Sequence, residues 1–315
     1  MTHKSSGDQA FLADSFYGRV NEPTYSGALS FFRRRYSKDL EGVDVAVLGV
    51  PFDTATTNRS GARLGPRAIR AASSIAAWER PYPWEFDVFE RLAVSDYGDC
   101  IFDFGRPQGV PAEIETQASE IVDAGVAILG LGGDHFATYP LLRAAAKKHG
   151  PLCLLHFDAH SDTWEDEEGR IDHGTMFFHA ANEGSIEAAH SVQIGLRTTN
   201  DKPMDFNIMD APWVHRHGVE AVIEKTKQVL GNRPVYLTFD IDCLDPAFAP
   251  GTGTPVCGGL STTQALEIIR GLRGLNLVGM DLMEVAPAYD VSEITALAGA
   301  SLAVEFLCLY ATRDS

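Results

Sequence analysis

In Val235-Tyr236-Leu237-Thr238-Phe239-Asp240-Ile241-Asp242, a short apolar run ends abruptly at a pair of aspartates. The same arrangement occurs twice earlier in the chain. The run at 126–129 precedes Gly132-Gly133-Asp134-His135, and the run at 152–155 precedes Asp158-Ala159-His160-Ser161-Asp162. An apolar run that ends in Asp or His is typical of a buried parallel strand whose carboxyl end delivers side chains into a crevice. The sequence therefore predicts three strand ends that share one polar site.

Around these runs, expected strands and helices alternate. A strand is expected at 43–50, and Pro66 suits the first turn of the helix after it. Ser261 followed by Gln264 predicts a capping box at another helix start. Four expected helices end at a glycine just before an apolar strand, namely Gly125, Gly150, Gly231 and Gly274. This alternation predicts an α/β fold with a parallel sheet and helices on both faces.

No Pro- or Ser-rich linker divides the chain after residue 43. We therefore expect one catalytic domain over 43–315, preceded by an N-terminal arm, 1–42, that makes oligomer contacts or is partly ordered. We interpret Arg33-Arg34-Arg35 in this arm as a solvated face or a subunit contact. Structural or ion-pair roles are expected for a second group of arginines, Arg59, Arg63, Arg67 and Arg70.

Composition excludes several classes of protein. The net charge of −17 argues against a nucleic-acid partner and is compatible with a cationic substrate, although it also serves solubility. No run of about 18 apolar residues predicts a membrane span, and residues 1–7 lack the apolar core of a signal peptide. Five cysteines without a C-x-x-C pair fit reduced thiols. A cytoplasmic protein is expected.

Six side chains at the three strand ends are candidate metal ligands: His135, Asp158, His160, Asp162, Asp240 and Asp242. Two carboxylates 4 Å apart repel by roughly 4 kcal/mol at an effective dielectric of 20, and a divalent cation between them removes this cost. Each aspartate taken alone more often caps a helix or accepts hydrogen bonds from loop amides. Their recurrence at three strand ends instead favours two metal ions. The absence of a thiolate favours manganese over zinc.

Because alternate residues of a strand share a face, Asp158, His160 and Asp162 are expected to point the same way, as are Asp240 and Asp242. This expectation requires that the extended conformation continues to the last ligand.

The three motifs, in this order, resemble the signatures of the arginase/agmatinase superfamily, the ureohydrolases. The segments 249–255, 258–260 and Met283-Glu284-Val285-Ala286-Pro287 are also typical of it, and the similarity extends over nearly the whole chain from Val43. Asp172-His173-Gly174-Thr175-Met176-Phe177 and Pro287-Ala288-Tyr289-Asp290 are most similar to bacterial agmatinases.

This resemblance implies an arginase/deacetylase-like fold of about eight parallel strands and a homotrimer or homohexamer. It implies two Mn²⁺ per subunit, of which Asp158 and Asp240 bridge both. The implied ligands are His135, Asp158, Asp162 and Asp240 for one ion, and Asp158, His160, Asp240 and Asp242 for the other. Deacetylases share the fold but use one zinc and adjacent histidines, and no His-His pair occurs in this chain.

The implied reaction is hydrolysis of a guanidinium group by a metal-bridging hydroxide. Glu284 follows the apolar stretch 275–283, and the resemblance gives it the role of holding the guanidinium by paired hydrogen bonds. His173 matches the position that protonates the leaving amine, and Asp162 could share this proton. The alternative for His173 is a loop histidine bonded to the backbone.

The loop Thr163-Trp164-Glu165-Asp166-Glu167-Glu168-Gly169-Arg170-Ile171-Asp172 bears on the substrate. Arginases use it to bind the α-carboxylate and amine of arginine with Asn, Thr and Ser side chains that are missing here. An acidic rim would attract the distal ammonium of agmatine and repel a carboxylate, by about 0–1 kcal/mol per exposed pair. We therefore expect hydrolysis of agmatine to putrescine and urea, a step of polyamine (putrescine and spermidine) biosynthesis.

Two alternatives remain open. A guanidinobutyrase, or another amidinohydrolase of an ω-guanidino acid, requires a basic group at the substrate's tail, such as Arg170 or an arginine of a neighbouring subunit. A metal-dependent binding or regulatory protein without turnover would be indicated by a missing ligand, and all six expected ligands are present.

Overall fold

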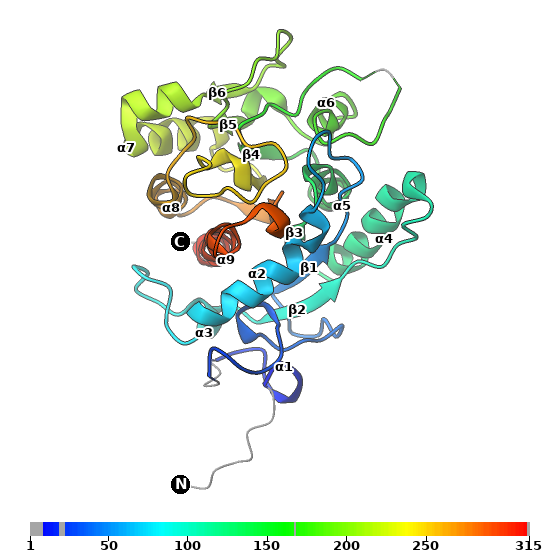
Figure 1. Ribbon diagram of the computed structural model, residues 1–315, viewed down its shortest axis with the longest axis vertical. Helices are drawn as coiled ribbons and strands as arrows, with labels where there is room; N and C mark the ends of the chain where they lie inside the picture. The colour runs from blue at the N-terminus through cyan, green and yellow to red at the C-terminus, as the bar shows by residue number, and fades with distance from the viewer. Residues whose placement is uncertain (1–8, 19–22, 167, 314–315) are drawn as a thin grey trace, which may run out of the picture.

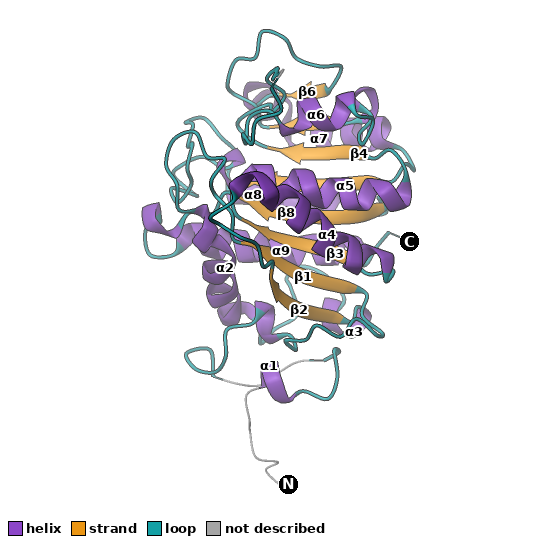
Figure 2. Ribbon diagram, turned by 90° about the vertical axis from the view of Figure 1, so that its right-hand side faces the viewer, coloured by secondary structure: helices purple, strands orange, loops and turns teal. Residues whose placement is uncertain are grey.

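The computed structural model describes residues 9–18, 23–166 and 168–313. Its described part contains one eight-stranded sheet in the order β2-β1-β3-β8-β7-β4-β5-β6, with every strand pair parallel (Figure 2). The strands are β1 (Val45–Val50), β2 (Val94–Asp99), β3 (Ala127–Gly132), β4 (Cys153–Phe157), β5 (Val192–Ile194), β6 (Asn207–Met209), β7 (Val235–Asp240) and β8 (Leu277–Met283). The predicted α/β fold with a parallel sheet of about eight strands is confirmed.

Helices cover both faces of this sheet (Figure 1). Buried apolar residues of the strands alternate between the two sides, so Val45 and Val47 belong to one core cluster and Ala46 and Leu48 to the other. On the second of these sides lie α4 (Val110–Asp123), α5 (Thr138–His149) and α6 (Met176–Asn182). On the first side lie α2 (Gly65–Ser73), α7 (Ala211–Leu230), α8 (Thr262–Gly271) and α9 (Ile294–Tyr310).

Shorter helices complete the described chain. Two of them are α-helical, α1 (Gln9–Leu12) and α3 (Val88–Arg91). The 3-10 helices are Phe31–Arg33, Ala62–Leu64, Ser74–Ala76, Pro107–Gly109, His135–Ala137, Ala188–His190, Ile241–Cys243 and Pro287–Tyr289.

The expected helix boundaries are confirmed. Pro66 lies in the first turn of α2, and Ser261 and Gln264 form the capping box that opens α8. All four glycines expected to end helices, Gly125, Gly150, Gly231 and Gly274, have positive φ. Left-handed backbone is open to glycine at little cost, so these positions turn the chain from a helix into the next strand.

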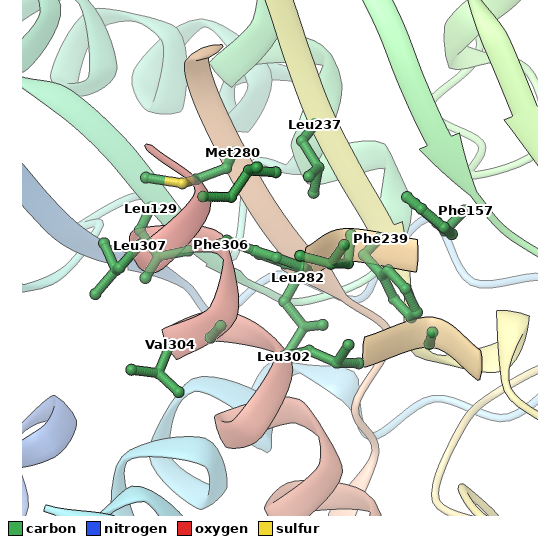
Figure 3. Close-up of a cluster of buried hydrophobic side chains, with 14 of the residues drawn as sticks. Leu129, Phe157, Leu237, Phe239, Met280, Leu282, Leu302, Val304, Phe306 and Leu307 are labelled. Atoms are coloured by element: carbon green, nitrogen blue, oxygen red, sulfur yellow. The ribbon is translucent and has the colours of Figure 1, made fainter. Parts of the chain in front are cut away.

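The most deeply buried helix is α9, which is apolar on nearly every side. Figure 3 shows Leu302 and Phe306 of this helix packed beside Phe239 of β7 and Leu282 of β8. This contact fixes the middle of the sheet, from which the three predicted strand ends emerge. Across the described segments, no helix combines the length and the apolar character that crossing a bilayer requires.

The arginines of the N-terminal arm correct one expectation. Arg33 and Arg34 are only 1% and 3% exposed, so a solvated face is wrong for both. Arg34 donates to the carbonyl of Gly18 at 2.5 Å, and its guanidinium lies 4.2 Å from the ring centroid of Phe89. These contacts tie the described part of the arm, 9–18 and 23–42, to the domain. Residues 1–8 and 19–22, part of the segment expected to be partly ordered, lie outside the described residues.

Arg70 has the structural role expected of it. Its guanidinium forms two hydrogen bonds with the fully buried carboxylate of Asp96, at 2.8 and 2.9 Å, and a third with Asp99 at 2.5 Å. Asp96 also accepts from the backbone N–H groups of Phe31 and Gly98. The pair thereby joins α2, β2 and the N-terminal arm.

Replacing Arg70 by methionine is expected to lower the free energy of unfolding by about 3–5 kcal/mol, because it leaves the buried Asp96 carboxylate without a cation. Urea-induced unfolding, followed by tryptophan fluorescence, measures this change. The control Asp99→Asn should cost less than about 1 kcal/mol, because the Asp99 side chain is 44% exposed. An Arg70→Met protein as stable as the parent would show that backbone amides alone satisfy Asp96.

Candidate metal centre and its cavity

Strand order brings the predicted ligands together. Because β3, β8, β7 and β4 are successive neighbours in the sheet, their carboxyl ends lie side by side. His135 opens the 3-10 helix after β3, Asp158 follows β4, and Asp240 ends β7. Glu284 follows β8 at the same edge. This edge is where ligands bind in open parallel sheets.

Two overlapping groups of side chains at this edge could hold metal ions. The first comprises His135, His156, Asp158 and Asp162, and the second comprises Asp158, His160 and Asp242. Asp158 belongs to both groups because its two oxygens face different partners. Its Oδ2 lies 2.9 Å from Nδ1 of His135, and its Oδ1 lies 3.3 Å from Nδ1 of His160.

Nδ1 of His135 is the centre of the first group. It lies 3.0 Å from Oδ2 of Asp162 and 3.3 Å from Oδ2 of Asp240, in addition to its contact with Asp158. Despite this proximity, the buried Nδ1 makes no aligned hydrogen bond among the described residues. In the second group, Nδ1 of His160 lies 3.1 Å from Oδ2 of Asp242. All six predicted ligands are therefore brought together.

The backbone orients these carboxylates. The N–H of His160 donates to Oδ1 of Asp158 at 2.6 Å, and the N–H of Asp242 donates to Oδ1 of Asp240 at 2.7 Å. Asp242 Oδ1 in turn accepts from the N–H of Ala159 at 3.0 Å. One oxygen of each of these carboxylates is thus held by a loop amide, so its position does not depend on a bound ion.

Strand alternation was the wrong reason for this convergence. β4 ends at Phe157, so Asp158, His160 and Asp162 lie in the loop after it, and Asp162 has the left-handed φ of 52°. Asp242 lies in the 3-10 helix Ile241–Cys243 rather than in β7. A tight turn, rather than a continued strand, directs the later ligands back toward the sheet.

The electrostatics of the cluster suit cations. Burial and the neighbouring carboxylates Asp242 and Asp158 raise the pKa of Asp240 well above its ordinary value. Burial and the Asp158 carboxylate likewise raise the pKa values of Asp162 and Asp242. Burial alone would lower the pKa of His160, but the charges and hydrogen bonds of Asp242 and Asp158 together outweigh burial and raise the value to about 12. Divalent ions would relieve this repulsion, and carboxylate and imidazole donors fit them.

His156 lies within the first group, yet its contacts favour local bonding over metal ligation. Its Nδ1 lies 3.0 Å from Nε2 of Gln193, and that same amide nitrogen donates to the carbonyl of Ser161 at 2.7 Å. Nδ1 of His156 therefore accepts, and Nε2–H donates to Asp158 at 2.8 Å. In this tautomer neither nitrogen has a free lone pair.

The far side of His135 is held by residues that the sequence reasoning missed. Its Nε2 lies 2.8 Å from Oγ1 of Thr238, which lies 3.3 Å from Oγ1 of Thr138. Such a contact orients a ligand histidine. Thr238 precedes Asp240 by two residues in β7, so the period of the strand could have found it. Nothing in the sequence around Thr138 indicated its contact.

His173 and Glu284 form a buried pair beside the cluster. Nδ1–H of His173 donates to Oε1 of Glu284 at 2.8 Å, and Oε1 also accepts from the backbone N–H of His135 at 2.9 Å. Oε2 of Glu284 is buried without a hydrogen-bond partner in the described chain. Glu284 has the left-handed φ of 65°, so the chain turns sharply where the carboxylate enters the site.

Two influences on His173 oppose each other. Burial lowers its pKa, but the hydrogen bond and charge of Glu284, together with the charges of Asp162 and Asp134, outweigh burial and raise the value to about 9. The backbone N–H of Thr57 donates to Nε2 at 3.0 Å, which requires a lone pair there. The arrangement seen is therefore that of the neutral ring, and protonation of Nε2 breaks the bond from Thr57. No motif indicated Thr57, which lies in the loop after β1.

A cavity of about 330 Å³ opens over the cluster. His160, Asp162 and Asp240 line it, so it reaches the candidate metal ligands. Other residues that line it are Thr57, Trp164, Glu165, Arg170, Asp172, His173, Gly174, Thr175 and Thr254. A volume of this size suits a small-molecule substrate.

The predicted acidic rim is only partly correct. Among the described acids of loop 163–172, Glu165 and Asp172 line the cavity. Asp166 instead faces inward, where it accepts from the backbone N–H groups of Arg170 and Glu168 and contacts His179 at 3.2 Å. The hydrogen bond from Arg170 is the main cause that lowers the pKa of Asp166 to about 2. Asp166 therefore holds the loop together through these hydrogen bonds. Glu167 lies outside the described residues.

The sequence model of the arginase family matches residues 43–309. Among curated proteins, the agmatinase of Chromobacterium violaceum is 58% identical to this chain, with 96% of this chain and 95% of the relative covered. The agmatinase of Proteus mirabilis is 52% identical, with 91% and 95% covered.

Solved structures agree with the sequence comparisons. A hypothetical agmatinase from Burkholderia thailandensis superposes with a TM-score of 0.96 at 57% identity, over 98% of both chains. Proclavaminate amidino hydrolase from Streptomyces clavuligerus superposes with a TM-score of 0.85 at 37% identity, over 93% of this chain and 100% of that one. Because both kinds of similarity span nearly the whole molecule, the chain belongs to the arginase family.

Proposed function

We propose that this protein is an agmatinase, a binuclear manganese enzyme that hydrolyses agmatine to putrescine and urea. The observation that carries the proposal is a cavity that reaches the cluster of carboxylates and imidazoles, where His160, Asp162 and Asp240 line it. The names of relatives that are 52–58% identical to this chain support agmatine as the substrate.

The donor set fits two divalent ions. Nδ1 of His135 is buried without an aligned hydrogen bond although it faces three carboxylates, as expected of a metal ligand. The ligands we assign are His135, Asp158, Asp162 and Asp240 for one ion, and Asp158, His160, Asp240 and Asp242 for the other. No thiolate is among them, which favours manganese. When bound, the pair of ions supplies a hydroxide nucleophile at neutral pH.

Glu284 is proposed to bind the guanidinium group. Its Oε2 is buried and unpaired among the described residues, so it can accept a charge-assisted hydrogen bond from a guanidinium N–H. Its Oε1 is already fixed by His173 and the backbone of His135. A carboxylate held on one side and open on the other orients the planar guanidinium over the cluster.

His173 is proposed to supply the proton to the leaving amine. It lines the cavity, and Glu284 with the nearby Asp162 and Asp134 raises its pKa to about 9 against the effect of burial. The paired imidazole can therefore carry a proton at neutral pH. Asp162, which also lines the cavity, is the second candidate for this proton.

Urea release from agmatine, arginine and 4-guanidinobutyrate, measured in parallel with added Mn²⁺, tests the substrate. We expect a kcat/KM for agmatine that exceeds the other two by at least about 10²-fold, because both competitors place a carboxylate in an acidic cavity. A preference for arginine or 4-guanidinobutyrate would contradict the agmatine proposal and leave the metal site untouched.

The second candidate, an amidinohydrolase of an ω-guanidino acid, is favoured by one observation. Arg170 lines the cavity, where it could meet a substrate carboxylate. The name of one structural relative, proclavaminate amidino hydrolase, supports an amidinohydrolase activity on this fold. In this chain Arg170 is paired with Asp166 at 3.3 Å, which favours the cationic substrate instead.

We further propose that the enzyme is cytoplasmic, takes part in polyamine biosynthesis, and forms a homotrimer or homohexamer through contacts that include the arm 1–42. Light scattering after gel filtration measures the number of subunits. A monomer at micromolar concentration would contradict the oligomer.

A further inference from the structure

The charges that line the cavity are unequally neutralised. Outside the candidate metal ligands, its two carboxylates are those of Glu165 and Asp172. Glu165 forms an ion pair with Lys202 at 2.6 Å. For Asp172, the one hydrogen bond to its carboxylate from the described residues is donated by the backbone N–H of Gly174, at 2.8 Å. Asp172 is therefore the lining carboxylate left available for a cation.

Trp164 lies against the same wall. A methyl group added to Gly174 would lie 3.1 Å from Cε3 of Trp164 and 3.3 Å from Oδ1 of Asp172, so the two side chains meet over this glycine. The N–H of Trp164 donates to the carbonyl of Gly174 at 3.1 Å, which joins the two ends of the loop. The indole ring also lies 6.4 Å from the ring of His160, a candidate metal ligand. The indole therefore neighbours both the cluster and Asp172.

We propose that Asp172 and Trp164 form a subsite for a primary alkylammonium group, the end of the substrate farthest from its guanidinium. This inference rests on the proposed function, which places the guanidinium at the metal cluster. An open carboxylate oxygen accepts charge-assisted hydrogen bonds from an ammonium, and an indole face attracts a cation within about 6 Å. The preference for a substrate with a cationic tail then comes from the Asp172 carboxylate and the Trp164 ring, rather than from the net charge of the loop.

Asp172 also has a structural function, and the choice of variant can separate the two. Its Oδ1 accepts from the N–H of Gly174 in the turn that leads into α6. Asparagine at this position retains an acceptor oxygen for the turn but removes the charge. Asp172→Asn therefore tests the cation subsite and leaves the loop's hydrogen bond in place.

The experiment compares agmatine with n-butylguanidine, which has the same guanidinium end and an uncharged tail, on the manganese-loaded enzyme. Asp172→Asn should raise the KM for agmatine on the order of tenfold more than the KM for n-butylguanidine, with kcat changed by less than about threefold. The inhibition constant of putrescine, measured against n-butylguanidine, should rise by a similar factor. Trp164→Leu should weaken agmatine binding more than Trp164→Phe, because phenylalanine keeps an aromatic face.

Glu165→Gln is the matched control, because it removes a cavity carboxylate that Lys202 already neutralises. It should change the KM ratio of the two substrates by less than about twofold. Equal effects of Asp172→Asn on both substrates, or no effect on either, would overturn the subsite while the proposed function stands. Wild-type enzyme that releases no urea from agmatine would contradict the proposed function and the subsite together.

Discussion

Replacement of Asp158 by asparagine is expected to abolish urea release, with a fall of at least about 10³-fold in kcat. Asp158 is the one residue that contributes an oxygen to both groups of candidate ligands, through Oδ2 toward His135 and Oδ1 toward His160. Asparagine keeps one oxygen and places an NH₂ group, which cannot ligate a cation, at the other. The bound manganese per subunit, measured by plasma mass spectrometry after dialysis, should fall with the activity.

Asp245→Asn is the matched control for this change. Asp245 lies five residues after Asp240 in the same motif, but its carboxylate accepts from the backbone N–H groups of Ala247, Gly258 and Gly259. The Asp245→Asn protein should therefore retain its manganese. Full metal content and activity in Asp158→Asn would contradict the assignment of Asp158 as a shared ligand.

Glu284→Gln is expected to lower kcat/KM for agmatine by about 10²–10³-fold, with the manganese content unchanged. The proposed contact is a buried charge-assisted pair, whose loss costs about 3–4 kcal/mol, and each 1.36 kcal/mol is a factor of ten. Steady-state urea release, combined with metal analysis, measures both quantities.

The metal content separates this effect from a damaged cluster. Glu284 belongs to neither group of candidate ligands, and its Oε1 is bound by His173 and the His135 backbone. Retained metal together with lost turnover would support a role in binding the guanidinium. A Glu284→Gln protein with the wild-type kcat/KM would contradict a role of Glu284 in binding the guanidinium. Loss of manganese from this variant would indicate that Glu284 supports the metal cluster instead.

Strand ends were predictable from the sequence because parallel strands are buried on both faces. An apolar run such as 235–239 that stops at Asp240 therefore marks the carboxyl edge of the sheet, and three such runs must share that edge. The capping box at Ser261 and Gln264 was predictable for a similar reason, since both of its partners are local in sequence.

Turns after the strands were not predictable from periodicity. The alternation argument assumed that β4 continues to Asp162, but the chain leaves the sheet after Phe157. A backbone amide then fixes Asp158, and the left-handed φ of Asp162 turns that carboxylate toward His135. The motif predicted which residues lie together, but the local geometry that positions them could not be predicted from it.

Contacts between distant segments were also beyond the sequence. Asp166 was read as part of an exposed acidic rim, yet it faces inward because His179 and the turn at Arg170 supply its partners. Arg33 and Arg34 were interpreted as part of a solvated face or a subunit contact. The backbone carbonyls and the Phe89 ring that they contact cannot be predicted from a run of three arginines.

The most direct test of a binuclear agmatine hydrolase is a titration of the chelator-treated, dialysed protein with Mn²⁺, followed by urea release from agmatine. We predict no turnover without metal, and a rise that reaches its maximum near two ions per subunit, because Asp158 serves two groups of ligands. Full turnover in the metal-free protein, or a maximum at one ion per subunit, would contradict the binuclear mechanism.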